Sequence, residues 1–315
     1  MRLNIISYLC SQKQNDKNMK INQPSFEIWE QQPGTDGVYR QVERCGRVCY
    51  KSENHQTADS ARPFVERMIA SEHTAMLEHA TVYLTLDEHD DRTELYRQNR
   101  FTHVNLVDGK AYITTNLRVL VENGRMDDLK ELCEPTALHE RRVTVHFTTQ
   151  VAITREFNRH RVNSMAEQST RYCNYSKEKF GAEITINLPQ WVKELPDGAW
   201  TSTIEEGTVS LDDDAFLALT KKVVAGEADA ADNWLFANLA AERAYLNLTA
   251  LGRKPQEARV VLPLDTNTEL IHTAFLSDWK HFFDLRALGT TGAPHPDAKA
   301  VALPLYEEMK RRFSL

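Results

Sequence analysis

The chain has 315 residues, a formal net charge of −7 and an isoelectric point near 5.9. This acidic balance opposes general nucleic-acid binding, which needs a broad basic surface. No run approaches the roughly 18 apolar residues of a membrane span, and the apolar piece from Ile5 to Cys10 is too short for a secretory signal. The composition therefore predicts a soluble, cytoplasmic protein with no nucleic-acid or membrane partner.

The cysteine content indicates reduced thiols rather than a disulfide framework. Five cysteines are an odd number in a large chain, whereas disulfide-rich scaffolds are typically short secreted domains. Cys45 and Cys49 form the only close pair, and no second Cys or His pair stands at ligand spacing. We therefore expect packing side chains and no metal site.

The first part of the chain predicts a leader followed by one domain. Residues 1–24 are polar and lack periodicity, which predicts a mobile leader ahead of a single domain over residues 25–315. Within that domain, Thr57 or Ser60 can cap a helix whose apolar residues recur four apart and which ends near Ser71.

Alternating apolar residues predict strands at 82–86 and 143–147. The segment between them, about 87–142, is predicted to be an insertion. Its Asp108-Gly109 pair is a strong hairpin turn, and a short helix follows that ends near Asn123-Gly124.

The second half predicts mainly helices. Thr149 suits the N-cap of one helix, and Pro255 suits the first turn of another. A last aromatic helix is expected from Phe275 to Arg286. A long helix at 232–251 has a predicted buried stripe consisting of Trp234, Ala237, Ala241, Tyr245 and Leu248.

The segment 154–172, TREFNRHRVNSMAEQSTRY, concentrates arginines in this acidic chain. If it is helical, Arg155 and Arg159 project together and Arg161 is turned away. Neither GxGxxG nor GxxxxGKS/T occurs, so phosphate must be held by side chains, and Arg forks with Ser and Thr hydroxyls suit that task. The alternative is ordinary ion pairing with surface carboxylates such as Glu156, which is common and contributes little stability.

The spacing of RHR, seven residues and Ser in RHRVNSMAEQS resembles the motif of the flavin-dependent thymidylate synthases. Further stretches follow in the family's order, namely RVCY at 47–50, HTAMLEH at 73–79, STRYCNYSKEKFG at 169–181, EARVVLPL at 257–264 and HFFDLRA at 281–287. The resemblance implies an α/β (α+β) fold like that of thymidylate synthase complementing protein, with helices around a largely antiparallel, mixed central sheet. It also implies a homotetramer with FAD at subunit interfaces.

The implied activity is reductive methylation of dUMP to dTMP. Methylenetetrahydrofolate is the implied carbon donor, and NADPH reduces the bound FAD that carries the hydride. Such hydride chemistry needs no enzyme nucleophile, in contrast to the unrelated thymidylate synthases that attack the ring with cysteine.

The resemblance also implies the site residues. The FAD contacts are His73, Arg159, His160, Arg161, Glu167 and His281, with the His73 loop reaching the flavin from another subunit. The dUMP contacts are Glu156, Arg159, Glu167, Gln168, Ser169, Thr170, Arg171, Arg259 and Arg286. Arg286 is the implied catalytic residue, because a guanidinium that stays protonated can stabilise negative charge on uracil N3 and O2.

One departure from the family pattern motivates an alternative function. Phe275, Leu276 and Ser277 stand where an Asn-Ala-Arg triplet with flavin contacts is common. A non-catalytic nucleotide-binding or regulatory homologue with an impaired flavin site would have the same arginine cluster. A single-stranded RNA-binding module is opposed by the net charge and by the absence of an RNP-type aromatic motif.

Overall fold

The computed structural model describes residues 18–177, 183–195, 207–313 and 315. The chain divides into two compact units, one from residues 1–23 and 174–267 and the other from residues 24–173 and 268–315. Residues 1–17 of the predicted leader lie outside the described residues, while Asn18–Asn22 form a strand. Among the described residues, no helix combines the length and apolarity that a membrane span requires.

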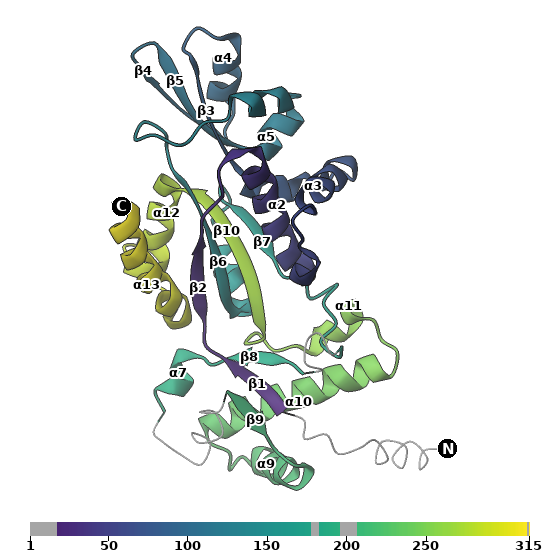
Figure 1. Ribbon diagram of the computed structural model, residues 1–315. Coiled ribbons are helices and arrows are strands. Elements are labelled where there is room, and N and C mark those ends of the chain that lie inside the picture. Colours follow the sequence, from purple (N-terminus) through teal and green to yellow (C-terminus); the bar gives the residue numbers. More distant parts are fainter. Residues whose placement is uncertain (1–17, 178–182, 196–206, 314) are drawn as a thin grey trace. The chain divides into compact units, whose positions relative to one another are not determined.

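The first unit contains a three-stranded sheet of order β8-β1-β9 (Figure 1). Strand β1 (Asn18–Asn22) pairs parallel with β8 (Thr185–Asn187) and antiparallel with β9 (Thr208–Ser210). The described helices of this unit are α7 (Gln190–Lys193), α9 (Asp213–Ala225), α10 (Ala230–Ala250), α11 (Pro255–Ala258) and the 3-10 helix η5 (Arg259–Val261).

Helix α10 buries Trp234 and Tyr245 as predicted, but the rest of its predicted stripe is partly wrong. Ala237 is exposed, and Glu242 is buried. The Glu242 carboxylate accepts a hydrogen bond of 2.8 Å from the backbone N–H of Ile184. This bond offsets the cost of burying the carboxylate. A pattern of apolar residues in the sequence cannot predict such a buried glutamate.

The second unit is built on a four-stranded sheet of order β2-β6-β10-β7 (Figure 1). Its strands are β2 (Ser25–Trp29), β6 (Arg142–Gln150), β7 (Ser164–Glu167) and β10 (Asn267–Phe275). Strand β2 pairs antiparallel with β6, and β7 pairs antiparallel with β10. The predicted α+β class, with helices around a largely antiparallel sheet, is confirmed.

Helices cover both faces of this sheet because its strands are apolar on both sides. Val145 and Phe147 of β6 pack against α12 (Leu276–Phe283) and α13 (Pro296–Phe313). On the other face, Trp29 and Ile271 pack against Cys45 and Val48 of α2 (Gly34–Tyr50). A short π-helix, Asp284–Leu288, continues α12.

The predicted insertion contributes most of a second antiparallel sheet of order β3-β5-β4 in this unit (Figure 1). The predicted hairpin is confirmed, with Asp108 and Gly109 both at positive φ between β4 and β5. Further strands and helices of the second unit are β3 (Thr81–Asp87), β4 (His103–Val107), β5 (Lys110–Asn116), α3 (Ala61–Ala70), α4 (Asp91–Gln98), α5 (Leu117–Glu122), η1 (Glu53–His55), η2 (Thr74–His79) and η3 (Met126–Glu131).

Two predicted boundaries are wrong. Phe275 ends β10 instead of starting the last aromatic helix, because Phe275 is buried as part of a strand that is covered on both faces. Gln150, not Thr149, is the N-cap of α6 (Val151–Phe157), and its side chain makes no capping bond.

Candidate functional site

The RHR motif lies in a turn, not on a helix. Helix α6 ends at Phe157, whose ring is fully buried against Phe147 and Phe282 at centroid distances of 5.0 and 4.9 Å. The expected common face of Arg155 and Arg159 is therefore wrong, because the helical repeat stops before Arg159. The turn instead directs Arg159 and Arg161 to one pocket.

This pocket, named the arginine pocket, has a volume of about 780 Å³. Its walls are the end of α6, the RHR turn, α12, the π-helix and the loop before α13. It brings together six predicted site residues, namely Glu156, Arg159, His160, Arg161, His281 and Arg286. Asn163, Asp278 and His295 also line it and were not predicted, since none of them belongs to a recognisable spacing.

Arg286 is held by two contacts at the wall of the arginine pocket. Its Nη1 donates to Glu156 Oε2 at 2.6 Å, and its Nε donates to His160 Nε2 at 3.2 Å. The Arg286 side chain is only 13% exposed. It projects from the π-helix, a rare conformation that occurs often at functional sites. The guanidinium is thus fixed in orientation before any ligand binds.

His160 is a neutral hydrogen-bond acceptor beside this guanidinium. Burial, with the positive charge of Arg286 and the neighbouring His281, lowers the pKa of His160 from 6.5 to about 4. Because Nε2 accepts from Arg286, the ring proton is assigned to Nδ1. The ring packs against Phe282 at a centroid distance of 5.0 Å. Because the His160 imidazole is neutral, the Arg286 cation lies beside it without charge repulsion.

Arg159 and Arg161 are exposed and carry uncompensated charge. Within the part of the chain that the structure describes, neither side chain forms an ion pair or a hydrogen bond. Glu156, the expected surface partner, is paired with Arg286 instead. The interpretation of this cluster as ordinary ion pairs is therefore wrong for these two residues. Their guanidiniums are available to anionic ligands of the arginine pocket.

The residues from Gln168 to Arg171, which are predicted to contact dUMP, form a turn after β7 and do not line the arginine pocket. The Gln168 N–H donates to the Glu269 carbonyl at 2.8 Å, and the Ser169 N–H donates to the Cys49 carbonyl at 2.9 Å. Glu167 precedes the turn, and its carboxylate accepts from the Thr154 hydroxyl at 2.7 Å. This segment, named the 168–171 turn, is therefore anchored to β10 and to α2.

His73 lines a separate pocket of about 430 Å³, together with Tyr50 and Tyr172. The two tyrosine rings contact each other at a centroid distance of 5.4 Å, and Tyr172 directly follows the 168–171 turn in sequence. Arg259 is exposed in η5 of the other unit. Within the second unit, six predicted site residues thus line the arginine pocket and His73 lines another, while Glu167 and the 168–171 turn line neither.

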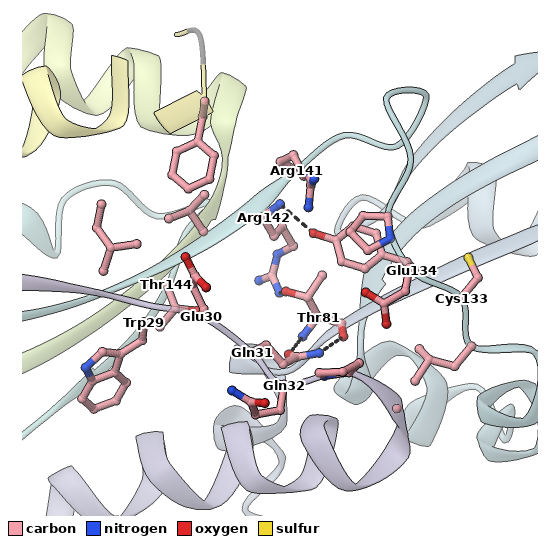
Figure 2. A pocket seen from close by; sticks show the side chains of 18 of the residues that line it. Trp29, Glu30, Gln31, Gln32, Thr81, Cys133, Glu134, Arg141, Arg142 and Thr144 are labelled. Carbon is pink, nitrogen blue, oxygen red and sulfur yellow. Dashed lines mark hydrogen bonds between the residues drawn. The ribbon is translucent and has the colours of Figure 1, made fainter. Parts of the chain in front are cut away.

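A third pocket, of about 380 Å³, contains none of the predicted site residues (Figure 2). Several of its lining residues form hydrogen bonds that connect strands of the fold. Gln31 forms two bonds of 2.8 Å with the backbone of Thr81, one to its carbonyl and one from its N–H. The Arg142 guanidinium donates to the Glu78 carbonyl at 2.9 Å and to the Ser164 hydroxyl at 3.1 Å. These bonds join the segment after β2 to β3, and β6 to η2 and β7.

The unusual Phe275–Ser277 segment packs against residues of the predicted insertion. The centroid of the Phe275 ring lies 4.1 Å from the centroid of the His103 ring in β4. The N–H of Leu276 donates to the Arg141 carbonyl at 2.9 Å, and the N–H of Ser277 donates to the Glu140 carboxylate at 3.1 Å. Two free N–H groups of the first turn of α12 are therefore satisfied from the insertion.

Two thiols of this unit, Cys45 and Cys49, are not activated. Burial raises the pKa of Cys49 to about 12, and burial also raises the pKa of Cys45. Cys173, beside the 168–171 turn, is fully buried. In the described ranges, no group of three or more His, Cys, Asp or Glu side chains is arranged to hold a metal ion.

The fold is of the α+β class, and its arginine pocket contains two arginines without a partner among the described residues. The chain belongs to the thymidylate synthase complementing protein family, whose model matches residues 108–313. The family predicted from the RHR motif is thereby confirmed.

Two solved structures of PolB from Streptomyces cacaoi, a UMP/dUMP methylase, are similar to the chain. The structure bound with 5-Br dUMP has 16% sequence identity, covers 93% of each chain and has a TM-score of 0.41. The structure bound with 5-Br UMP has 15% identity, covers 93% of this chain and 92% of that chain, and has a TM-score of 0.40. None of the curated proteins compared with the chain matches it.

The neutral state of His160 predicts a pH-dependent stability. The unfolded chain binds a proton at His160 near pH 6.5, whereas the folded chain does so only near pH 4. The unfolded state therefore binds more protons in this window, and the free energy of unfolding falls as the pH falls through it. His160→Gln should reduce this loss by about 1–2 kcal/mol between about pH 7 and about pH 5.

Urea unfolding at both pH values measures this effect. His89→Gln is the control, because the His89 side chain is 86% exposed, and it should retain the parent pH dependence. An unchanged pH dependence in His160→Gln would mean that His160 is not held neutral in the folded state.

Proposed function

We propose that the protein reductively methylates dUMP to dTMP, with methylenetetrahydrofolate as carbon donor and NADPH-reduced FAD as hydride carrier. The observation that carries this proposal is the arginine pocket, where the RHR motif of a family member meets Glu156, His281 and Arg286. Phosphate binding through side chains alone is consistent with the absence of a glycine-rich phosphate loop.

The residues of the arginine pocket fit FAD. Two guanidiniums without partners among the described residues, Arg159 and Arg161, suit its pyrophosphate. His160 and His281 add ring surfaces next to them. We expect these four residues, Glu167 and a His73 from another copy to hold the cofactor. When bound, FAD supplies the redox chemistry that amino-acid side chains lack.

The nucleotide is expected to contact Glu156, Arg159, Arg286 and Glu167, the 168–171 turn from Gln168 through Ser169 and Thr170 to Arg171, and Arg259. The turn and the arginines suit the phosphate, because hydroxyl, backbone N–H and guanidinium groups all donate to its oxygens. Glu156 and Arg286 together present an acceptor and a donor 2.6 Å apart. The N3–H and O2 groups of uracil are complementary to such a pair.

Arg286 is proposed to activate the pyrimidine electrostatically. Its contacts with Glu156 and His160 hold the guanidinium, and its remaining N–H donors have no partner among the described residues. Those donors can stabilise negative charge that develops on uracil N3 and O2, which lowers the barrier without reorganisation. The raised pKa values of Cys45 and Cys49 support a mechanism without an enzyme nucleophile.

The rival function is a non-catalytic nucleotide-binding or regulatory homologue with an impaired flavin site. It is favoured by the Phe275–Ser277 segment, which packs against the insertion in place of the usual triplet. The visible spectrum of the purified protein separates the two functions. The enzyme should show flavin bands and form dTMP from dUMP, methylenetetrahydrofolate and NADPH. Failure to bind FAD, even with FAD and dUMP added, would favour the rival.

Replacement of Arg286 tests its catalytic role. Arg286→Ala should lower the rate of dTMP formation by roughly 10²–10³, the usual loss for one charge-stabilising donor. Arg286→Lys should recover only part of this loss, because an ammonium cannot present a planar fork. Arg155→Ala is the matched control, since Arg155 is exposed on the same segment and does not line the arginine pocket.

These rates are measured at saturating dUMP, with the flavin absorbance as a check that cofactor content is retained. Parent-like turnover of Arg286→Ala under these conditions would remove Arg286 from the mechanism and make Arg259 the next candidate.

A cytoplasmic homotetramer with shared sites is the proposed assembly. Two pockets of the second unit support this assembly, because within a single chain His73 lines one of them and Arg286 lines the arginine pocket. Inactive His73→Ala and inactive Arg286→Ala proteins should regain activity when they are mixed under subunit exchange, since some sites then combine intact residues from two chains. Complete exchange of subunits, verified by native mass spectrometry, without any recovery would contradict a shared site.

A further inference from the structure

Lys51 has a backbone conformation that is unfavourable for lysine. It is the C-cap residue of α2, with φ 49° and ψ 57° in the left-handed region. Its N–H donates to the Val48 carbonyl at 3.2 Å, and the next N–H, of Ser52, donates to the Arg47 carbonyl at 3.1 Å. Glycine is the usual residue at such a helix end, because a Cβ is strained in this conformation. The lysine side chain must therefore contribute something that glycine cannot.

The Lys51 ammonium binds the Glu269 carboxylate on β10 and lies 3.6 Å from Glu53. Glu269 also accepts from His146 Nε2 at 2.9 Å, and its side chain is only 12% exposed. Burial opposes the ionisation of Glu269, but the hydrogen bond from His146 and the Lys51 charge lower its pKa below the ordinary value. The structure thus contains an ion pair between the end of α2 and β10 whose carboxylate is largely buried and whose lysine side chain is 33% exposed.

The two partners of this ion pair stand next to the two anchors of the 168–171 turn. Glu269 itself supplies the carbonyl that accepts the Gln168 N–H at 2.8 Å. Cys49, two residues before Lys51, supplies the carbonyl that accepts the Ser169 N–H at 2.9 Å. The turn therefore has one anchor on β10 and one on the last turn of α2. The Lys51–Glu269 pair connects the end of α2 to β10 beside these two anchors.

We propose that Lys51 and Glu269 are positioning residues that hold the 168–171 turn in the conformation that receives the nucleotide phosphate. This inference rests on the proposed function, in which that turn binds dUMP. Neither side chain is expected to touch the ligand. Their effect is to place donors such as the Ser169 hydroxyl before binding, which reduces the conformational cost of association. The backbone strain at Lys51 is retained because the ammonium is needed there.

The test removes the ammonium without harming the helix end. Lys51→Gly suits the left-handed backbone but deletes the charge, and the double variant Lys51→Gly/Glu269→Gln also removes the carboxylate that has lost its lysine partner. Lys51→Arg retains the ion pair. Glu53→Gln is the matched control, because it removes a second carboxylate near Lys51. The Glu53 side chain is 41% exposed. All variants are compared as full-length holoenzyme.

We expect Lys51→Gly and the double variant to raise the Kd for dUMP roughly tenfold, as for one misplaced hydrogen-bond donor. Turnover at saturating dUMP and flavin content should change little, and Lys51→Arg and Glu53→Gln should resemble the parent. The double variant separates positioning from folding. If its unfolding midpoint returns to the parent value while the Kd stays raised, the pair positions the turn. A parent-like Kd in the double variant would overturn the proposal.

Amide hydrogen exchange of Gln168 and Ser169 without nucleotide gives a second readout. Both amides should exchange several-fold faster in Lys51→Gly, since their acceptors are no longer held together. Unchanged exchange would overturn the proposal even if dUMP proved not to be the ligand. A parent protein that neither binds dUMP nor forms dTMP would overturn the proposed function, and faster exchange in Lys51→Gly would then still report the positioning of the turn.

Discussion

The packing of three aromatic rings determines the arginine pocket. Phe147 of β6, Phe157 of α6 and Phe282 of α12 are fully buried and contact one another. Rings of this size dominate the energetics of a core. Helix α6 ends at Phe157, and the contact of this ring with Phe282 places α12 beside the RHR motif. Residues 156–161 and the wall formed by Asp278, His281 and Arg286 are thereby held opposite each other, with the His160 ring packed against Phe282.

The charges in this pocket are arranged for an anion. Only one of its three arginines, Arg286, has a carboxylate partner among the described residues, and His160 between them is neutral. Burial raises the pKa of the Asp278 carboxyl at the same wall, which weakens its competition for the arginines. An anionic ligand would supply the missing negative charge, and it would be attracted despite the acidic character of the chain as a whole.

The insertion has a structural role that reaches the wall of the arginine pocket. Glu140 and Arg141 satisfy the first N–H groups of α12, and His103 covers Phe275. The departure from the family triplet at 275–277 and the longer chain at about 87–142 are therefore physically connected. The segment that packs against the insertion directly precedes Asp278 and His281, which line the arginine pocket.

The sequence alone determined those features that depend on neighbouring residues. The spacing from RHR to Ser169 identified the family, the positive φ demanded at Asp108-Gly109 located a hairpin, and alternation located β3 and β6. Tertiary structure decided the rest, because the deciding contacts join distant residues. Strand β10 is buried on both faces and so lacks alternation. Glu156 pairs with Arg286 across 130 positions, and Lys51 with Glu269 across 218. No local pattern encodes such pairs, since each partner is defined only when the sheet and helices have packed.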